Sequence, residues 1–190
     1  DIIESVSDEF AGITDAVWST VVPLETVNGE ANELSMEFSG GTSVRIGVGY
    51  PFILHSPTVG GAGDATLQWY MKPRDQGHNG LFWTQDGGGD ANRYNIHMQS
   101  AGLGADFREE GGTLHGVMAG QVTMPLDVWS HLAVVRTDLG DGTHNYDWYL
   151  EGLFNNAQIA SAQVPVAETW TSSGRGGCCN AYEGWLDEVH

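Results

Sequence analysis

Thr66-Leu-Gln-Trp-Tyr-Met-Lys-Pro73 is the stretch of this 190-residue chain that decides the fold. Leu67, Trp69 and Met71 recur at every second position, and this period of two predicts a strand that buries one of its faces. Pro73 ends the strand because proline has no backbone N–H to offer a neighbouring strand.

The same alternation recurs along the chain in short segments that are separated by glycine-rich turns. Glycine accounts for 27 of the 190 residues, which suits many tight turns, and no window shows sustained helical periodicity. The further segments that we expect to be strands are residues 34–38, 44–48, 81–85, 94–98, 103–108, 129–137, 146–150 and 182–189. Short strands at this spacing predict an all-β protein, a jelly-roll sandwich of two antiparallel sheets.

Charge excludes several classes of partner. The chain has 25 Asp and Glu against 7 Lys and Arg, a formal net charge of -18. Such a surface repels phosphate backbones and anionic lipid headgroups, so we expect no nucleic-acid partner and no binding to anionic membranes. No apolar run approaches the ~18 residues of a membrane helix, so no membrane insertion is expected. A signal peptide is absent or already removed, since no basic segment with an apolar stretch follows Asp1.

Five short motifs follow one another between residues 34 and 190: Leu34-Ser-Met-Glu-Phe38-Ser-Gly40, Thr66 to Pro73, Trp129-Ser-His131-Leu-Ala133, Trp148-Tyr-Leu-Glu-Gly152 and Tyr182-Glu-Gly-Trp-Leu-Asp-Glu-Val189. In kind and in order they resemble the strands of laminin-G-like domains, within the concanavalin A-like lectins and glucanases. One departure concerns the second motif, where Tyr70 stands at the family's tryptophan and Trp69 precedes it. This shift leaves the facing of that strand open.

The resemblance implies a concanavalin A-like jelly roll, with residues 1–190 as a single domain and residues 1–33 outside the matching motifs. Because the last motif runs to the end of the sequence, we expect the domain to be part of a longer protein. Family members are mostly secreted or cell-surface proteins, bind glycans or other proteins, and often carry calcium. These properties are expectations here, because a fold does not fix a function.

Catalytic carboxylates are not expected. Retaining glycosidases need two carboxyl groups ~5–5.5 Å apart. Glu183 and Asp187 share a strand face but lie four residues apart, ~13 Å along a strand. Asp187 and Glu188 point to opposite faces. The sequence therefore predicts a non-enzyme with no catalytic residues.

A group of polar residues is the candidate ligand-binding face. Asn95, His97 and Gln99 alternate with apolar residues, as do Asp106 and Arg108 on the next segment. If these two strands pair, the five side chains share one face. Sugars are recognised by planar polar groups beside an aromatic plate, which Trp83 and Tyr70 are placed to supply. The competing interpretation is an ordinary solvated sheet face.

Two places are candidate calcium sites, since hard cations bind carboxylate and carbonyl oxygens. The resemblance implies Asp187 with backbone carbonyls around Ser39 and Gly40. The second candidate is a loop with three oxygen-bearing side chains, Asp86, Asp90 and Asn92. For Asp187 the alternative is a buried carboxylate that accepts backbone N–H groups.

The two cysteines, Cys178 and Cys179, are adjacent. A disulfide between neighbours closes a strained ring, because their Cα atoms lie only ~3.8 Å apart. A vicinal disulfide, two free thiols and links to another chain stay open, and the flanking glycines favour the first.

Taken together, the residues and the resemblance favour a non-catalytic carbohydrate-binding, lectin-like domain of an exported or surface protein. The alternative is a protein-interaction or structural domain in a cell-surface or viral assembly. A glycan-active hydrolase or lyase is the third hypothesis. We expect the partner to be a glycan or a surface protein.

Overall fold

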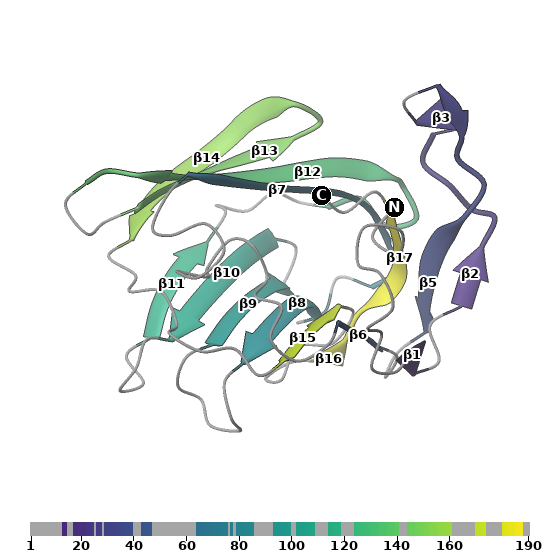
Figure 1. Ribbon diagram of the computed structural model, residues 1–190, viewed down its shortest axis with the longest axis horizontal. Helices are drawn as coiled ribbons and strands as arrows, with labels where there is room; N and C mark the ends of the chain where they lie inside the picture. Colours follow the sequence, from purple (N-terminus) through teal and green to yellow (C-terminus); the bar gives the residue numbers. More distant parts are fainter. Residues whose placement is uncertain are drawn as a thin grey trace.

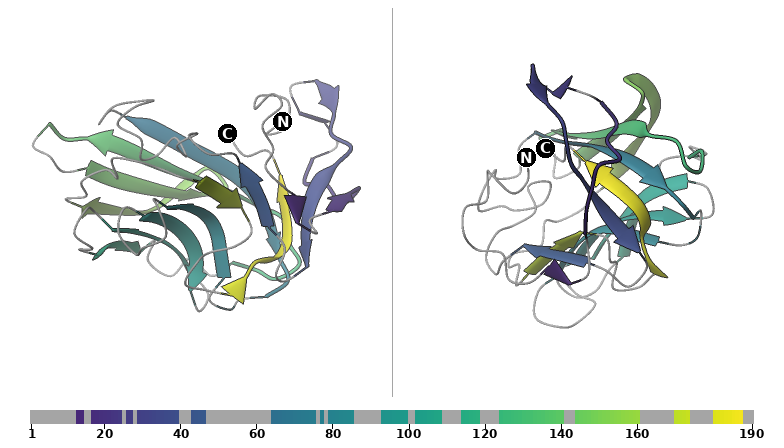
Figure 2. Two further views of the ribbon diagram at one scale, coloured as in Figure 1. Left: turned by 60° about the horizontal axis from the view of Figure 1, so that its bottom comes forward. Right: turned by 90° about the vertical axis from the view of Figure 1, so that its right-hand side faces the viewer.

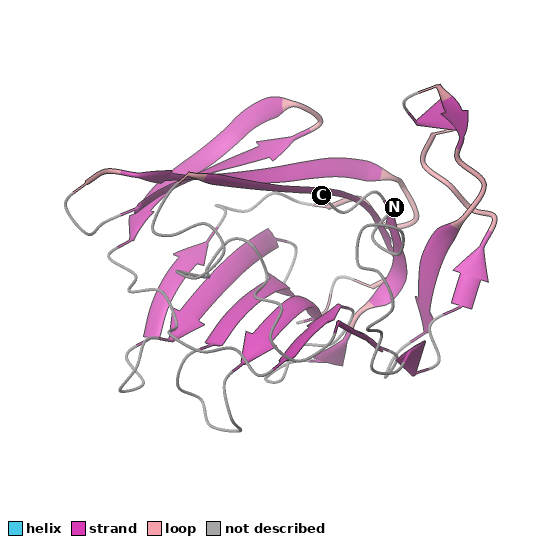
Figure 3. Cartoon of the chain, viewed as in Figure 1, coloured by secondary structure: helices cyan, strands magenta, loops and turns pink. Residues whose placement is uncertain are grey.

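The structure is a computed structural model, and it describes residues 13–14, 17–24, 26–27, 29–39, 43–46, 64–75, 77, 79–85, 93–99, 102–108, 114–118, 124–140, 144–160, 170–173 and 180–187. These residues form strands, turns and loops, and no helix occurs among them (Figure 3). The expected all-β class is therefore confirmed.

One layer is a seven-stranded sheet in which every neighbouring pair is antiparallel. Its order is β14 (Leu153–Ala160), β13 (His144–Leu150), β12 (Ser130–Asp138), β7 (Ala65–Pro73), β17 (Glu183–Asp187), β5 (Ser35–Ser39) and β2 (Val17–Ser19). The last strand of the chain thus lies between two much earlier ones, as the right-hand view of Figure 2 shows.

The other layer is an eight-stranded sheet that faces the first (Figure 1). Its order is β1 (Ile13–Thr14), β6 (Ser43–Ile46), β15 (Trp170–Ser173), β8 (Asn79–Gln85), β9 (Arg93–Gln99), β10 (Gly102–Arg108) and β11 (Leu114–Met118). A short strand, β16 (Asn180–Ala181), pairs with β8 in parallel, the one departure from the expected antiparallel pairing in the described part of the chain. The two facing layers form the predicted jelly-roll sandwich.

A small hairpin stands away from both sheets. It consists of β3 (Thr26–Val27) and β4 (Glu30–Ala31), and Gly29 in its turn has a φ of 87°. Glycine adopts this left-handed conformation without steric cost. Figure 1 shows the hairpin beyond the end of the sandwich where β5 and β2 lie.

The core follows the alternation read from the sequence. Leu67, Trp69 and Met71 on β7 are buried, whereas Tyr70 between them is partly exposed. The facing of this strand is thereby resolved: Trp69 points into the sandwich and Tyr70 points away from it. On β12 and β13 the inward positions include Leu132, Val134, Tyr146 and Trp148. Burying a large apolar side chain contributes roughly 1.5–3 kcal/mol, so these side chains hold the sheet against its partner.

Two polar side chains are also buried on the inner face of this sheet. Arg136 on β12 is 1% exposed and lies directly opposite Tyr146 on β13, which is fully buried. Burial raises the pKa of Tyr146, and the Arg136 guanidinium opposes part of that rise. The phenol therefore stays neutral at physiological pH.

Several strands were not expected from the sequence. β11 contains a central glycine, β14 carries Asn155 and Asn156, and β15 is only four residues long. Glycine and asparagine are depleted in strands, and short segments show little periodicity. These strands form because neighbouring strands supply their backbone partners. The strands β1 to β4, in the N-terminal part outside the family-like motifs, are two or three residues long and give no pattern either.

Candidate functional site

The predicted ligand-binding positions lie on the eight-stranded sheet, on β9 and β10. These strands pair in antiparallel register, with Asn95 opposite Asp106, His97 opposite Gly104 and Gln99 opposite Gly102. Arg108 pairs with Arg93. Directly opposite residues occupy the same face of a sheet, so the five predicted positions share one face of the strand pair. Their side chains lie outside the described residues, and their role in binding stays a prediction.

A third strand extends this row. The register of β8 against β9 places Trp83 opposite Asn95, which itself lies opposite Asp106. Positions 83, 95 and 106 therefore form one line across three strands, spaced about 4.8 Å apart. The side chain of Trp83 is likewise outside the described residues. An aromatic plate beside an amide and a carboxylate at these positions stays a prediction.

Tyr70 does not join this row, because it belongs to the seven-stranded sheet. It lies on that sheet's outer face, which we define as the face turned away from the eight-stranded sheet. There its ring contacts the imidazole of His131 on β12, with ring centroids 4.8 Å apart and a tilt of 44°. The structure thus separates two aromatic residues, Trp83 and Tyr70, that sequence reasoning had grouped.

Tyr70 instead belongs to a second row, on the outer face. Asp187 on β17 lies opposite Tyr70, which lies opposite His131. The row ends at Glu151, whose Oε1 accepts a 2.9 Å hydrogen bond from the backbone N–H of His131. The backbone N–H of Glu151 returns a 2.9 Å hydrogen bond to the carbonyl of His131. His131 and Glu151 were missed at first, because the sequence does not show which strands pair.

The two carboxylates of this row do not form a glycosidase pair. Asp187 and Glu151 are separated by Tyr70 and His131, which amounts to three strand spacings or about 14 Å. Hydrolysis of a glycosidic bond uses carboxyl groups roughly 5–9.5 Å apart. This pair is therefore suited to orienting neighbours and not to acid–base work on one sugar bond.

Asp187 has a different setting from the one that the resemblance implied. It is 9% exposed, and its Oδ2 accepts a 2.9 Å hydrogen bond from the side-chain amide of Asn32. The register pairs Glu183 with Ser39, so Asp187 lies four residues further along β17, about 13 Å from Ser39. The expected grouping of Asp187 with the Ser39 carbonyl is wrong for this reason.

The remaining candidate ligands cannot be placed. Asp86, Asp90 and Asn92 lie outside the described residues, as do Cys178 and Cys179. Within the described ranges, no group of three or more His, Cys, Asp or Glu side chains is arranged to hold a metal ion.

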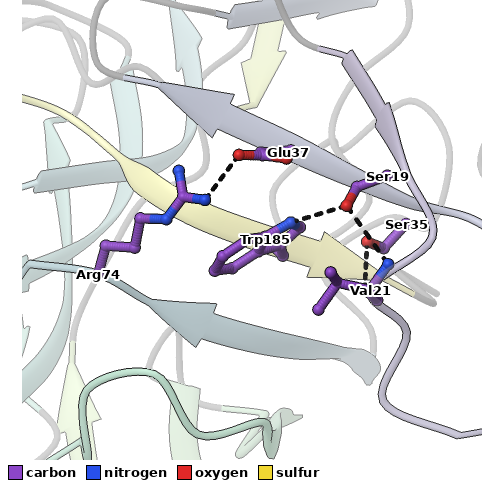
Figure 4. A network of polar contacts seen from close by, with 6 residues as sticks. All are labelled: Ser19, Val21, Ser35, Glu37, Arg74 and Trp185. Atoms are coloured by element: carbon purple, nitrogen blue, oxygen red, sulfur yellow. Dashed lines mark hydrogen bonds and ion pairs between the residues drawn. The ribbon is translucent and has the colours of Figure 1, made fainter.

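A network of polar contacts joins the first strands to the last (Figure 4). The indole Nε1 of Trp185 donates a 3.0 Å hydrogen bond to Oγ of Ser19 on β2. The guanidinium of Arg74 lies 4.0 Å from the Trp185 ring centroid and forms a 2.7 Å ion pair with Glu37 on β5. The ammonium of Lys72 lies 4.8 Å from the same ring. Trp185 is thus buried on the outer face beneath two cations.

The other tryptophans of the motifs differ among themselves. Trp148 is in the core, 2% exposed, whereas Trp129 is partly exposed. Trp129 directly precedes β12, where the chain enters the sheet from the turn at Asp127.

Comparisons with known proteins identify the fold and no more. No protein-family model matches the sequence, and no curated protein matches it either. Among solved structures, domains LG4-5 of the mouse laminin alpha1 chain match with a TM-score of 0.60 at 9% identity, covering 95% of this chain and 46% of that one. The receptor binding domain of botulinum neurotoxin D matches with a TM-score of 0.60 at 8% identity, covering 94% and 42%.

An enzyme is among the similar structures. An endo-beta-1,4-glucuronan lyase from the fungus Trichoderma reesei matches with a TM-score of 0.57 at 12% identity, covering 96% of this chain and 90% of that one. This chain spans less than half the length of the laminin and toxin fragments. The fold is the concanavalin A-like jelly roll, the resemblance that the sequence motifs indicated.

The described part of the chain holds no helix long and apolar enough to cross a membrane.

Proposed function

We propose that this domain is a non-catalytic carbohydrate-recognition module, with its binding face on β8, β9 and β10. The observation that carries the proposal is the register that aligns positions 83, 95 and 106 across three adjacent strands. An aromatic residue beside an amide and a carboxylate suits the apolar face and the hydroxyl groups of a sugar ring. His97, Gln99 and Arg108 extend the same face with further planar polar groups.

The fold supports this proposal in a general way. Two of the three similar structures described above are named as a toxin receptor-binding domain and as domains of laminin. Because one similar structure is a lyase, the absence of catalysis needs its own test. Incubating the domain with glucuronan and with neutral polysaccharides is expected to release no shortened products.

A glycan array with and without calcium tests the binding. The wild-type domain should retain a glycan that Trp83→Ala and Asn95→Ala variants lose. Glu30→Ala, in the exposed hairpin of β3 and β4, is the matched control and should bind as the wild type does. Retention of every bound glycan by both face variants would refute the proposed face.

We further propose that the protein is exported and that a calcium ion stabilises the loop containing Asp86, Asp90 and Asn92. The motive is the chain's excess of acidic residues together with the three oxygen-bearing side chains in that loop. An ion that binds only the native state raises its stability, so calcium should raise the melting temperature relative to excess chelator. Equal melting temperatures would count against the ion.

A protein-interaction domain is the second candidate function, and one observation favours it. Val17 and Trp18 lie on β2, the outermost of the described strands at this side of the seven-stranded sheet, and are 56% and 48% exposed. An edge strand offers unpaired backbone groups, and exposed apolar side chains beside it suit a protein partner. This function would be favoured over the first if the wild-type domain retains a surface protein, the Trp18→Ser variant does not, and neither binds a glycan.

A further inference from the structure

Five side chains on the outer face of the seven-stranded sheet form what we call the outer-face patch. They come from three adjacent strands and are all partly exposed. The five residues are Gln68, Tyr70, His131, Ala133 and Tyr149. The register places Ala133 opposite Gln68 on one side and opposite Tyr149 on the other. Tyr70 and His131 lie opposite each other one row away.

Ala133 has the smallest side chain of this patch. Its methyl group has aromatic neighbours in three directions: His131 two residues earlier on β12, Tyr149 across the strand pair, and Tyr70 on the diagonal. Diagonal neighbours in a sheet lie ~7–8 Å apart, within reach of an aromatic side chain. A small side chain among aromatic residues on a partly exposed sheet face suits a flat, amphipathic ligand ring.

Two hydrogen bonds tie the backbone of His131 in the patch to Glu151. Glu151 has a positive φ of 52° and begins the turn into β14, where it exchanges two hydrogen bonds with the backbone of His131. These bonds hold the backbone of His131, whose ring lies 4.8 Å from that of Tyr70 between centroids. A preorganised pair of rings loses little entropy when a ligand stacks on it.

Charge selects the class of ligand. Three carboxylates lie around the patch on the same face, those of Asp187, Glu151 and Asp147, and the whole chain has a net charge of -18. The nearest described cation on the face, Lys72, lies over the ring of Trp185. These carboxylates repel a sulfated or uronic-acid glycan. The hydroxyl groups of a neutral sugar can instead donate hydrogen bonds to carboxylate and amide acceptors.

We propose that the outer-face patch binds a neutral saccharide, with a sugar ring stacked against Tyr70 and Tyr149 over Ala133. The patch lies on the other sheet from the face of β8, β9 and β10, so it is a separate binding surface. The proposal stands whether or not that first face binds a ligand.

Titration of the wild-type domain with neutral cello-, manno- and xylo-oligosaccharides, followed by NMR, tests the proposal. At least one of them should shift the backbone signals of Tyr70 and Ala133, while oligoglucuronate should leave these signals unchanged. Replacing Tyr70 by Ala should weaken that binding about tenfold, because a stacked ring contributes roughly 0.5–1.5 kcal/mol beyond its buried area.

The control is Thr66→Ala, an exposed change on the same strand and face beyond the patch. Asn95→Ala on the other sheet separates the two surfaces. Binding lost in the Asn95 variant but intact in Tyr70→Ala and Tyr149→Ala would overturn the patch and leave the first face standing. Signal shifts at the patch with oligoglucuronate, or only with a basic peptide, would also overturn it. So would the absence of any shift with every ligand. The wild-type NMR titration keeps the test valid if a variant fails to fold.

Discussion

The hydroxyl of Tyr182 donates a 3.0 Å hydrogen bond to the backbone carbonyl of Trp185 inside the protein. Both residues belong to the closing motif, and Gly184 lies between them. Gly184 has a φ of 143°, a conformation that side chains rarely adopt. The bond and the glycine together let the last strand pass closely over a phenol ring and enter the sheet.

Replacing Gly184 by Ala is expected to be among the most damaging changes in this domain. An added Cβ would lie 2.3 Å from the carbonyl oxygen of Lys72 and 2.6 Å from the Tyr182 hydroxyl. Backbone on the partner strand cannot move aside cheaply, so we expect a loss of roughly 3 kcal/mol or more. Chemical denaturation measures it. Gly29→Ala, which meets no atom within 4 Å but shares a positive φ, is the control and should cost only about 1 kcal/mol.

Tyr182 makes stability sensitive to alkaline pH. Burial raises its pKa well above the usual 10.0, and it does the same for Tyr146. Because the folded pKa values are raised, their contribution is fully present below pH 10 and declines as the unfolded chain ionises above it. The free energy of unfolding should therefore fall as pH rises beyond about 10.

The matched variant is Tyr182→Phe, which keeps the ring but removes the ionisable group. It should cost about 1 kcal/mol at pH 7 through the lost hydrogen bond. Above pH 10 its free energy of unfolding should decline less steeply than that of the wild type. An equally steep decline would show that Tyr182 does not titrate on unfolding.

Arg74 should contribute more to stability than its ion pair alone. Its side chain is 38% exposed, and its guanidinium contacts both Glu37 and the face of Trp185. Exposed ion pairs contribute roughly 0.2–1 kcal/mol, and an exposed cation–π contact adds about 0.5–1 kcal/mol. We expect Arg74→Ala to cost about 1–2 kcal/mol and Glu37→Gln less than half of that. High salt should reduce only the part of the stability that comes from the ion pair with Glu37. Equal losses of stability in Arg74→Ala and Glu37→Gln would rule out a contribution from the Trp185 ring.

The adjacent cysteines give a prediction that mass spectrometry decides. We expect Cys178 and Cys179 to form a vicinal disulfide, so alkylation without reductant should add no mass to the monomer. Two added alkyl groups would mean free thiols. A dimer on a non-reducing gel would mean a bond to another chain.

Sequence reasoning worked best where burial imposes an alternation. The alternation of Leu67, Trp69 and Met71 predicted β7, because a period of two reflects one-sided packing, whereas the face that is buried was settled by the structure, in which Trp69 is buried. The closing motif likewise predicted β17. Strands such as β14 were not predicted. The polar residues of β14 form a strand only because they pair with β13.

The candidate site was less predictable than the fold. The pairing of β9 with β10 was expected because these segments adjoin in sequence, and the register agrees with it. Tyr70 was assigned to the wrong neighbours, because nothing in its own strand shows that β12 lies beside it. His131 is 61 residues away along the chain, and only the sheet order brings the two rings together.

The position of β17 between β7 and β5 has a consequence for how the protein is made. During synthesis, β17, which joins the two parts of the seven-stranded sheet, emerges after the other described strands of the sheet. Before β17 is available, β5 and β2 are not joined to β7 by backbone hydrogen bonds. The apolar inner faces of both parts of the sheet are then exposed to solvent. Contacts between residues as distant as Ser19 and Trp185 require a slow, late closure. A chain that lacks β17 should therefore fail to fold and be removed by proteolysis.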